Sequence, residues 1–104
     1  MEMFDLFREI WDEREDEEGY CYCYETGDPM HGSRFRNNSC CYHHLLPKGK
    51  YPEYALVKKN IVILHPDIHT LLESNIDKCP KTKKLMERIK CELDDRSDKE
   101  GLLE

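Results

Sequence analysis

Hydrophobic positions in the first part of the chain recur with the period of a helix. The apolar side chains are Met3, Phe4, Phe7, Ile10 and Trp11, with charged residues between them. This spacing places them on one face and predicts an amphipathic helix over residues 2–14. The acidic run over residues 12–18 ends the helix, and Gly19 breaks its pattern.

Short strands and turns are predicted next. Residues 20–25 are few and rich in aromatic side chains, which is typical of a strand, and the Thr-Gly-Asp-Pro sequence of residues 26–29 predicts a turn. We expect a polar loop or an irregular strand over residues 30–37, and a second strand over residues 39–42. Prolines and a glycine indicate a long loop over residues 45–59.

The remaining hydrophobic segments predict a strand and two helices. Residues 61–64 read as a four-residue apolar strand. Pro66 suits the first position of a helix, because its fixed φ and missing N–H are harmless there, and this helix should run to about Ser74. A further helix is expected over residues 81–93, and the polar tail from Asp94 is expected to fray. The apolar face of that last helix consists of Leu85, Met86, Ile89 and Leu93.

Composition limits the possible classes of protein. The 104 residues suffice for one small domain, and with 37% charged residues its core must be thin. Such a domain often needs a metal, a partner chain or long packed helices. No apolar run approaches ~18 residues, so we expect no membrane span. The N-terminus lacks the pattern of a signal peptide, so the six cysteines are expected to be reduced thiols of a cytoplasmic protein rather than disulfides.

The distribution of charge changes the meaning of the net charge of −6, which by itself argues against a nucleic-acid enzyme. Residues 1–30 hold 11 acids and 2 bases, whereas residues 31–60 hold 6 bases and 1 acid. The bases of the second segment are Arg34, Arg36, Lys48, Lys50, Lys58 and Lys59. Because they surround a pair of histidines, we predict that they contact nucleic-acid phosphates, the alternative being lysines that only keep a loop soluble.

Four of the five histidines lie in the segment 42–73. The predicted order there is a strand ending in His43 and His44, a loop, Asn60, an apolar strand, and a helix carrying His69. Adjacent residues of a strand point to opposite sides, so the two neighbouring histidines cannot do the same job. One can bind a metal ion while the other acts as a general base.

The helix and the asparagine add further candidate groups. His69 and Glu73 are four residues apart on the same predicted helix and therefore share a face. A metal ion needs neutral imidazole or carboxylate ligands that converge on it. Asn60 has both an amide donor and an acceptor, so it can tie the long loop and orient the ring of His44.

This segment resembles the HNH (ββα-metal) endonucleases. The resemblance rests on His44 followed by Pro47, on Asn60 before an apolar strand, and on the position of His69 nine residues after Asn60. The double histidine, and Pro66 six residues after the asparagine, are similar to the colicin-type branch. Residues 7–14, 26–27 and 43–48 together look like small phage- and prophage-encoded HNH proteins. The stronger part of the resemblance covers roughly residues 20–75.

The resemblance implies a single α+β domain. Residues 20–75 would form the ββα-metal core, also called a His-Me finger, between an N-terminal helix with an acidic run (1–19) and a C-terminal helix with a tail (76–104). It also implies a metal-dependent endonuclease that hydrolyses DNA phosphodiester bonds and leaves 5′-phosphate ends. Such a protein would act in the cytoplasm of a bacterium or a phage-infected host, in connection with a phage or another mobile element.

The resemblance also assigns roles to individual residues. It makes His43 and His69 metal ligands, His44 the general base and Asn60 the orienting asparagine. Glu73 stands where colicin-type enzymes carry another histidine. A carboxylate at that position can still coordinate, and it favours magnesium or manganese over zinc.

His65 and the cysteines leave alternatives open. His65 stands where many relatives carry a cysteine of a zinc knuckle, and it can be a metal ligand, a helix-start residue or a phosphate contact. A structural zinc could be held by Cys21, Cys23, Cys40 and Cys41. The pairs are separated by one and by no residue, however, whereas zinc knuckles use two to four, so small buried side chains suit them equally well. We expect Cys79 and Cys91 to be buried, and His31 to be exposed in a polar loop.

The main alternative to an enzyme is a non-catalytic nucleic-acid-binding or protein-interaction module that keeps a structural metal centre. A third hypothesis is an accessory nuclease that is inactive without a phage or recombination partner protein. Because one site cuts one strand, a homodimer formed through the terminal helices is also compatible with the sequence.

Overall fold

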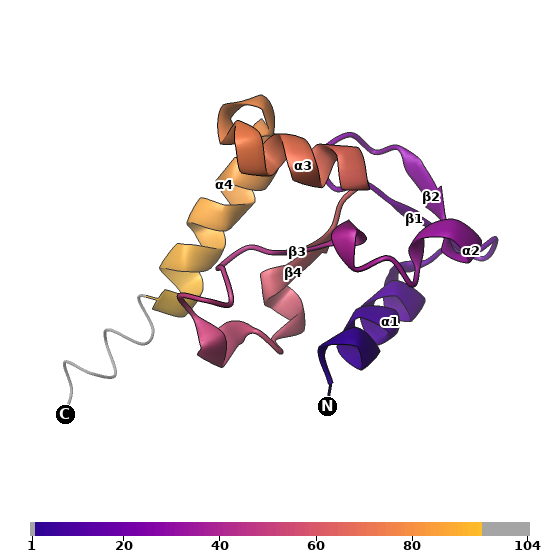
Figure 1. Cartoon of the computed structure of the whole chain (residues 1–104), viewed down its shortest axis with the longest axis horizontal. Coiled ribbons are helices and arrows are strands. Elements are labelled where there is room, and N and C mark those ends of the chain that lie inside the picture. Colours follow the sequence, from indigo (N-terminus) through magenta and orange to yellow (C-terminus); the bar gives the residue numbers. More distant parts are fainter. Residues whose placement is uncertain (1, 95–104) are drawn as a thin grey trace.

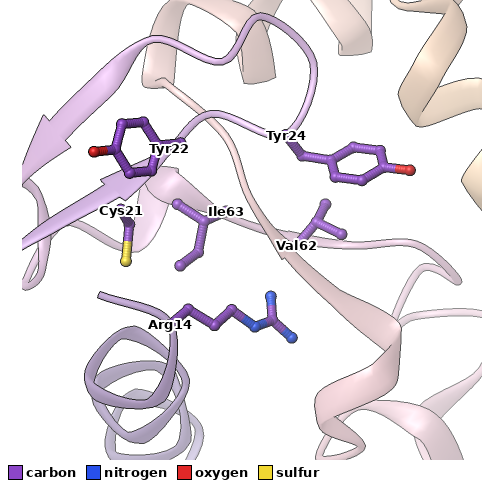
Figure 2. A pocket seen from close by; sticks show the side chains of 6 residues that line it. All are labelled: Arg14, Cys21, Tyr22, Tyr24, Val62 and Ile63. Carbon is purple, nitrogen blue, oxygen red and sulfur yellow. The ribbon is translucent and has the colours of Figure 1, made fainter. Parts of the chain in front are cut away.

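Two small antiparallel sheets organise the chain, which a computed structural model describes over residues 2–94 (Figure 1). In the first sheet β1 (Tyr20–Tyr22) pairs with β2 (Pro29–His31), and in the second β3 (Tyr42–His44) pairs with β4 (Ile61–Ile63). The N–H of Tyr24 donates to the carbonyl of Ile63 (2.9 Å), which attaches the first hairpin to the outer edge of β4. The side chains of Val62 and Ile63 accordingly line the same hollow as those of Tyr22 and Tyr24 (Figure 2).

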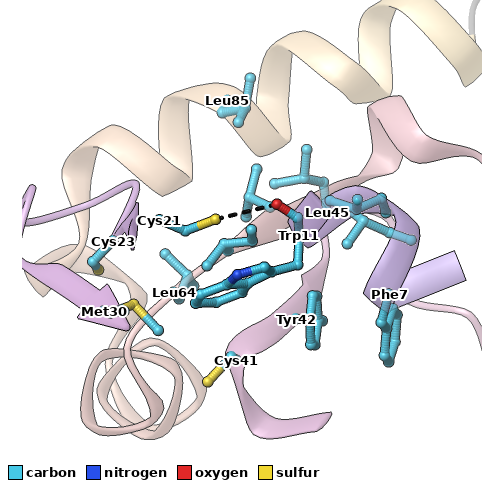
Figure 3. Close-up of a cluster of buried hydrophobic side chains, with 14 of the residues drawn as sticks. Phe7, Trp11, Cys21, Cys23, Met30, Cys41, Tyr42, Leu45, Leu64 and Leu85 are labelled. Atoms are coloured by element: carbon cyan, nitrogen blue, oxygen red, sulfur yellow. Dashed lines mark hydrogen bonds between the residues drawn. The ribbon is translucent and has the colours of Figure 1, made fainter. Parts of the chain in front are cut away.

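The helix α1 (Met3–Arg14) confirms the prediction for residues 2–14. Its apolar face supplies the centre of the core, with Ile10 and Trp11 fully buried. Figure 3 shows the Trp11 ring surrounded by side chains from both sheets and from α1. Phe7 stacks on Tyr42 of β3, with ring centroids 4.4 Å apart, so α1 packs directly against the strand that carries the histidine pair.

The segment between the sheets differs from the prediction. Residues 30–37, expected to be loop or irregular strand, contain most of β2 and a one-turn helix, α2 (Gly32–Phe35). Ser39–Cys41 form a 3₁₀ turn instead of a strand, because the Asn38 side chain accepts a hydrogen bond from the N–H of Cys40 (3.0 Å) and caps the turn. The strand begins only at Tyr42.

The last two helices cover the sheets from another side. α3 (Pro66–Ser74) has the predicted bounds, and α4 (Pro80–Ile89) is shorter than expected because Lys90–Asp94 form a π-helical turn. In Figure 1 the β3–β4 pair lies between α4 and α1, with α3 across one end. The predicted fraying of the tail concerns residues beyond 94, which lie outside the described part of the chain.

The cysteines act mainly as small core residues. Cys21, Cys23, Cys41 and Cys79 are buried, whereas Cys40 and Cys91 are exposed. The prediction for Cys91 was wrong because the π-helical turn follows Ile89 and interrupts the helical face. Burial raises the pKa of the thiols of Cys21 and Cys41 to about 12, so both stay protonated. Within residues 2–94 no three or more His, Cys, Asp or Glu side chains are arranged to hold a metal, so the structure offers no support for the four-cysteine zinc site.

In residues 2–94 no helix combines the length and the apolar character needed to cross a membrane.

Candidate active site

The strand β3 sends its two histidines in different directions. The Nδ1 of His43 lies 3.3 Å from the Nε2 of His69 on α3. The Nε2 of His44 lies 3.0 Å from the carbonyl oxygen of Ala55, in the long loop. The structure therefore confirms that the neighbouring histidines occupy different positions, as alternation along a strand requires.

Hydrogen bonding selects one tautomer of His69. Its Nδ1 lies 2.7 Å from the carbonyl oxygen of Cys40, and a carbonyl can only accept a hydrogen bond. The proton of the neutral ring is therefore on Nδ1, and the lone pair on Nε2 points toward His43. A backbone carbonyl on the far nitrogen is the usual way in which a protein orients a metal-binding histidine.

His43 is held as a neutral ring. Burial, together with the nearby imidazoles of His69 and His44, lowers the pKa of His43 to about 4. Its Nε2 is buried and has no hydrogen-bond partner among the described residues. Its Nδ1 can donate to the lone pair of His69, or it can be unprotonated and present a second lone pair to the same point.

The arrangement in which both histidines present a lone pair fits a metal ion, as the distances between the ligand atoms show. Two ligand atoms ~2.1 Å from one ion in tetrahedral geometry lie about 3.4 Å apart. The two histidine nitrogens are 3.3 Å apart, and the Oε1 of Glu73 lies 3.5 Å from the Nε2 of His69. The Glu73 side chain is 72% exposed, and within residues 2–94 its only ion pair is with His69. Among the described residues no three such side chains already surround one point, so the structure brings together two of the predicted ligands and places the third beside one of them.

His65 has a structural role at the start of α3. Its Nδ1 accepts a hydrogen bond from the N–H of Asp67 (3.2 Å), and its ring packs against Phe35 with centroids 5.3 Å apart. Within residues 2–94 no side-chain hydrogen bond or ring contact joins its imidazole to those of His43 or His69. Of the three roles considered for His65, helix capping is the one that the structure shows, and the metal-ligand role has no support.

Asn60 ties the loop that orients His44. It is fully buried, and its Oδ1 accepts from the N–H of Leu46 (2.7 Å). Its Nδ2 donates to the carbonyls of Leu46 (3.1 Å) and Tyr54 (3.2 Å). The carbonyl of Ala55, one residue after Tyr54, is the acceptor for His44. The predicted role of Asn60 in tying the loop is confirmed, and the structure connects that role to His44 through the backbone of the loop.

The other nitrogen of His44 is available for chemistry. The ring donates from Nε2 to Ala55, so its Nδ1 carries the lone pair. This Nδ1 is neither bonded nor sealed from solvent within the described part of the chain. Burial lowers the pKa of His44 and outweighs the opposite effect of the Ala55 carbonyl, so the ring is neutral at pH 7. Such an atom can accept a proton from a water molecule.

Two backbone carbonyls belong to the site, and their roles cannot be predicted from the residue types. The oxygens of Cys40 and Ala55 select the tautomers of His69 and His44, and any residue type supplies the same group. Only the fold brings these two carbonyls beside the rings.

Acidic residues of α1 neutralise part of the predicted basic segment. Both Nε and Nη2 of Arg36 donate to the carboxylate of Asp12 at 2.8 Å. The Nζ of Lys58 lies between Glu9 (3.1 Å) and Glu13 (2.6 Å). These bases are 24 to 49 residues from their partners along the chain. The negative N-terminal segment thus folds back onto the positive one.

The other four predicted phosphate contacts differ among themselves. Lys59 forms an ion pair with Glu92. Arg34 and Lys50 each lie over the aromatic ring of the residue that follows them. Lys48 is exposed, and its charge lies close enough to His44 to contribute to the lowered pKa of that ring. Lys48 is therefore a predicted contact whose charge acts on the candidate base.

Comparison with known proteins found no matching family model, no matching curated protein and no matching solved structure. The α+β class is established for the described residues by the helices and the two antiparallel sheets. Membership of the HNH family stays a prediction.

Proposed function

We propose that the chain is a metal-dependent endonuclease that hydrolyses DNA phosphodiester bonds. The observation that supports this most directly is that the two histidines of β3 face different surroundings. His43 faces a second imidazole whose lone pair points toward it, while His44 is anchored by a carbonyl that leaves its Nδ1 free. Phosphodiester hydrolysis needs both a cation near the phosphate and a base for the attacking water, and these are two separate positions.

The residues that would hold the ion are His43 through Nδ1 and His69 through Nε2, with Glu73 as the third ligand. When bound, the ion acts as a Lewis acid that stabilises negative charge on the phosphate and on the departing oxygen. The carboxylate of Glu73 favours magnesium or manganese, whereas the two imidazoles also suit zinc. The exposed Glu73 side chain can turn toward the ion without disturbing the core.

His44 would perform the proton transfer. Its Nδ1 takes a proton from water while the water oxygen forms a bond to phosphorus. The bond from phosphorus to the 3′ oxygen breaks, that oxygen takes up a proton from solvent, and the phosphate remains on the 5′ side, as the resemblance implies. The Ala55 carbonyl, which accepts from Nε2, stabilises the imidazolium that forms.

The test is nicking of supercoiled plasmid with Mg²⁺ or Mn²⁺, with an EDTA control. His44→Ala should reduce the rate by roughly 10²–10⁴-fold, the usual contribution of a general base. His31→Asn is the matched control, because His31 is exposed on the other sheet and asparagine can keep its capping hydrogen bond to Ser33. Equal nicking rates for the wild type and His44→Ala would refute the role of His44 as the general base.

One observation favours the non-catalytic alternative, in which the metal serves stability only. Arg36, Lys58 and Lys59, predicted to contact phosphates, are engaged by carboxylates. A structural metal would make the melting temperature fall on chelation while no nicking is seen with either ion. An accessory nuclease would instead gain nicking activity when its partner protein is added.

A further inference from the structure

One face of α4 carries positive charge that the described part of the chain does not neutralise. Lys81, Lys84 and Arg88 are three and four residues apart and therefore share a face of the helix. All three are exposed, and together with Leu85 and Tyr24 they line a hollow of about 290 Å³. We call these three bases the α4 cationic face.

These bases differ from most of those predicted to contact phosphates. Within residues 2–94 none of the three forms an ion pair, and Lys81 lies instead over the ring of Tyr24, 5.3 Å from its centroid. The acidic residue of the same helix, Glu87, lines a neighbouring hollow with Asp77, Lys83 and Lys84, but it forms no ion pair with Lys84 among the described residues. The charge of the α4 cationic face is therefore available to a ligand.

Like charges at this spacing weaken a helix, because Lys84 and Arg88 repel each other across one turn. A neighbouring lysine of the same helix, Lys83, is paired with Asp77 at 2.7 Å, whereas Lys84 and Arg88 form no ion pair among the described residues. An anion bound along this face would remove the repulsion.

A second hollow, which contains one further base, Arg14, lies beside the first. It has a volume of about 240 Å³ and shares Tyr24 with the first hollow. Figure 2 shows Val62 and Ile63 between the rings of Tyr22 and Tyr24 and the side chain of Arg14. The guanidinium of Arg14 donates to the carbonyls of Ile61 (3.0 Å) and Lys58 (3.4 Å), so its charge is fixed in place but not cancelled by an acid.

Tyr24 thus lies between a fixed arginine on one side and three unpaired bases on the other. A row of positive charges with tyrosine rings among them is complementary to a nucleic-acid strand, whose phosphates recur along the backbone. A purely hydrophobic ligand is a poor match for the first hollow, because three bases line it.

We propose that the α4 cationic face binds the phosphate backbone of DNA. The proposal rests on the proposed nuclease function for the identity of the polyanion. It assigns substrate binding to residues 81–88, outside the segment whose bases the sequence nominated. Binding here would position the strand without reading its sequence, since phosphate contacts carry no base information.

The experiment measures fluorescence anisotropy of a short labelled duplex, and of the corresponding single strand, in EDTA at several salt concentrations. The test variant is Lys81→Gln/Lys84→Gln/Arg88→Gln. The matched control is Arg8→Gln/Lys83→Gln/Lys90→Gln, which removes the same net charge elsewhere. The test variant should lose affinity roughly 10- to 100-fold near 0.1 M salt. The slope of log K against log salt should become shallower by about 2 to 3, whereas the control should change little.

Equal losses in both variants, or no binding by the wild type to either DNA, would overturn the proposal. Thermal unfolding tests a purely structural role: removing the repulsion should leave the melting temperature of the test variant unchanged or raise it. A lower melting temperature with unchanged affinity would assign these bases to the fold and also overturn the proposal.

Nicking measured in parallel with Mn²⁺ separates this proposal from the proposed function. Binding through the α4 cationic face by a protein that does not nick would contradict the nuclease and leave the DNA-binding surface intact. Nicking by a protein whose affinity is the same in wild type and test variant would contradict the surface alone.

Discussion

Asn60 and Leu46 are joined by a reciprocal pair of hydrogen bonds. The amide oxygen accepts from the backbone N–H (2.7 Å), and the amide nitrogen donates to the backbone carbonyl (3.1 Å). The same nitrogen also reaches Tyr54, so one buried side chain holds both ends of the loop that carries the Ala55 carbonyl. The position of the His44 ring therefore depends on a residue whose side chain forms no hydrogen bond with it in the described part of the chain.

Replacing Asn60 by aspartate should destabilise the protein and displace His44. The aspartate keeps the oxygen that accepts from the N–H of Leu46. It places a second oxygen where the amide nitrogen stood, so the buried carbonyls of Leu46 and Tyr54 lose their donor. We expect the free energy of unfolding in urea to fall by about 2–4 kcal/mol. Asn75→Asp is the control, because Asn75 is an exposed cap and aspartate caps equally well. Equal stability of the two variants would contradict the role assigned to Asn60.

Glu25 caps the helix that carries the α4 cationic face. Its two carboxylate oxygens accept from the N–H groups of Lys81 (3.2 Å) and Thr82 (2.9 Å), at the positive end of the helix dipole. Glu25→Ala should lower the free energy of unfolding by about 1 kcal/mol. Glu53→Ala, which removes an exposed carboxylate from the loop, should leave it unchanged. A loss of the same size in both variants would mean that the cap contributes nothing.

His43 should make the metal-free protein less stable in mild acid. Its pKa is about 4 in the folded chain, against about 6.5 when unfolded, so between these values the unfolded chain binds a proton that the folded chain does not. The free energy of unfolding must therefore fall as the pH falls from 6.5 toward 4, by up to ~3 kcal/mol from this group.

The measurement compares urea unfolding of the wild type and His43→Gln in EDTA between pH 7 and pH 4. The difference in the free energy of unfolding between the wild type and His43→Gln should become smaller in acid, because glutamine does not titrate. Carboxylates that titrate in the same range are present in both proteins and cancel. Parallel curves for the two proteins would refute the burial of a neutral His43.

Metal binding should depend on His43 and His69 and not on His65. Addition of Mn²⁺ or Zn²⁺ should raise the melting temperature of the wild type, and His69→Ala should abolish the increase. Glu73→His should strengthen the response to Zn²⁺ relative to Mn²⁺, because it replaces a carboxylate by a third imidazole. His65→Asn keeps the helix cap and should respond like the wild type, whereas loss of the response in this variant would restore His65 as a ligand.

Elements with a strong local pattern were predictable from the sequence. The helices over residues 3–14 and 66–74 follow from apolar spacing and from Pro66, and the opposed directions of His43 and His44 follow from the alternation of a strand. The start of β3 was misplaced by three residues, because the cap made by Asn38 competes with an extended backbone at Ser39–Cys41.

The candidate site could be predicted from the sequence only where its functional groups belong to side chains. The sequence by itself determined the residue types and their spacing: two histidines at a strand end, an asparagine before the next strand, and a histidine with a glutamate one helical turn later. These properties are local, since they depend on periods of two and of 3.6 residues.

Only the tertiary structure decided which charges remain free and which nitrogens carry lone pairs. Asp12 cancels Arg36 across 24 residues of chain, and the carbonyls of Cys40 and Ala55 set the tautomers of His69 and His44. The physical reason is that ion pairs and hydrogen bonds act over a few ångströms in space. No local pattern records which distant groups the fold will bring within that range.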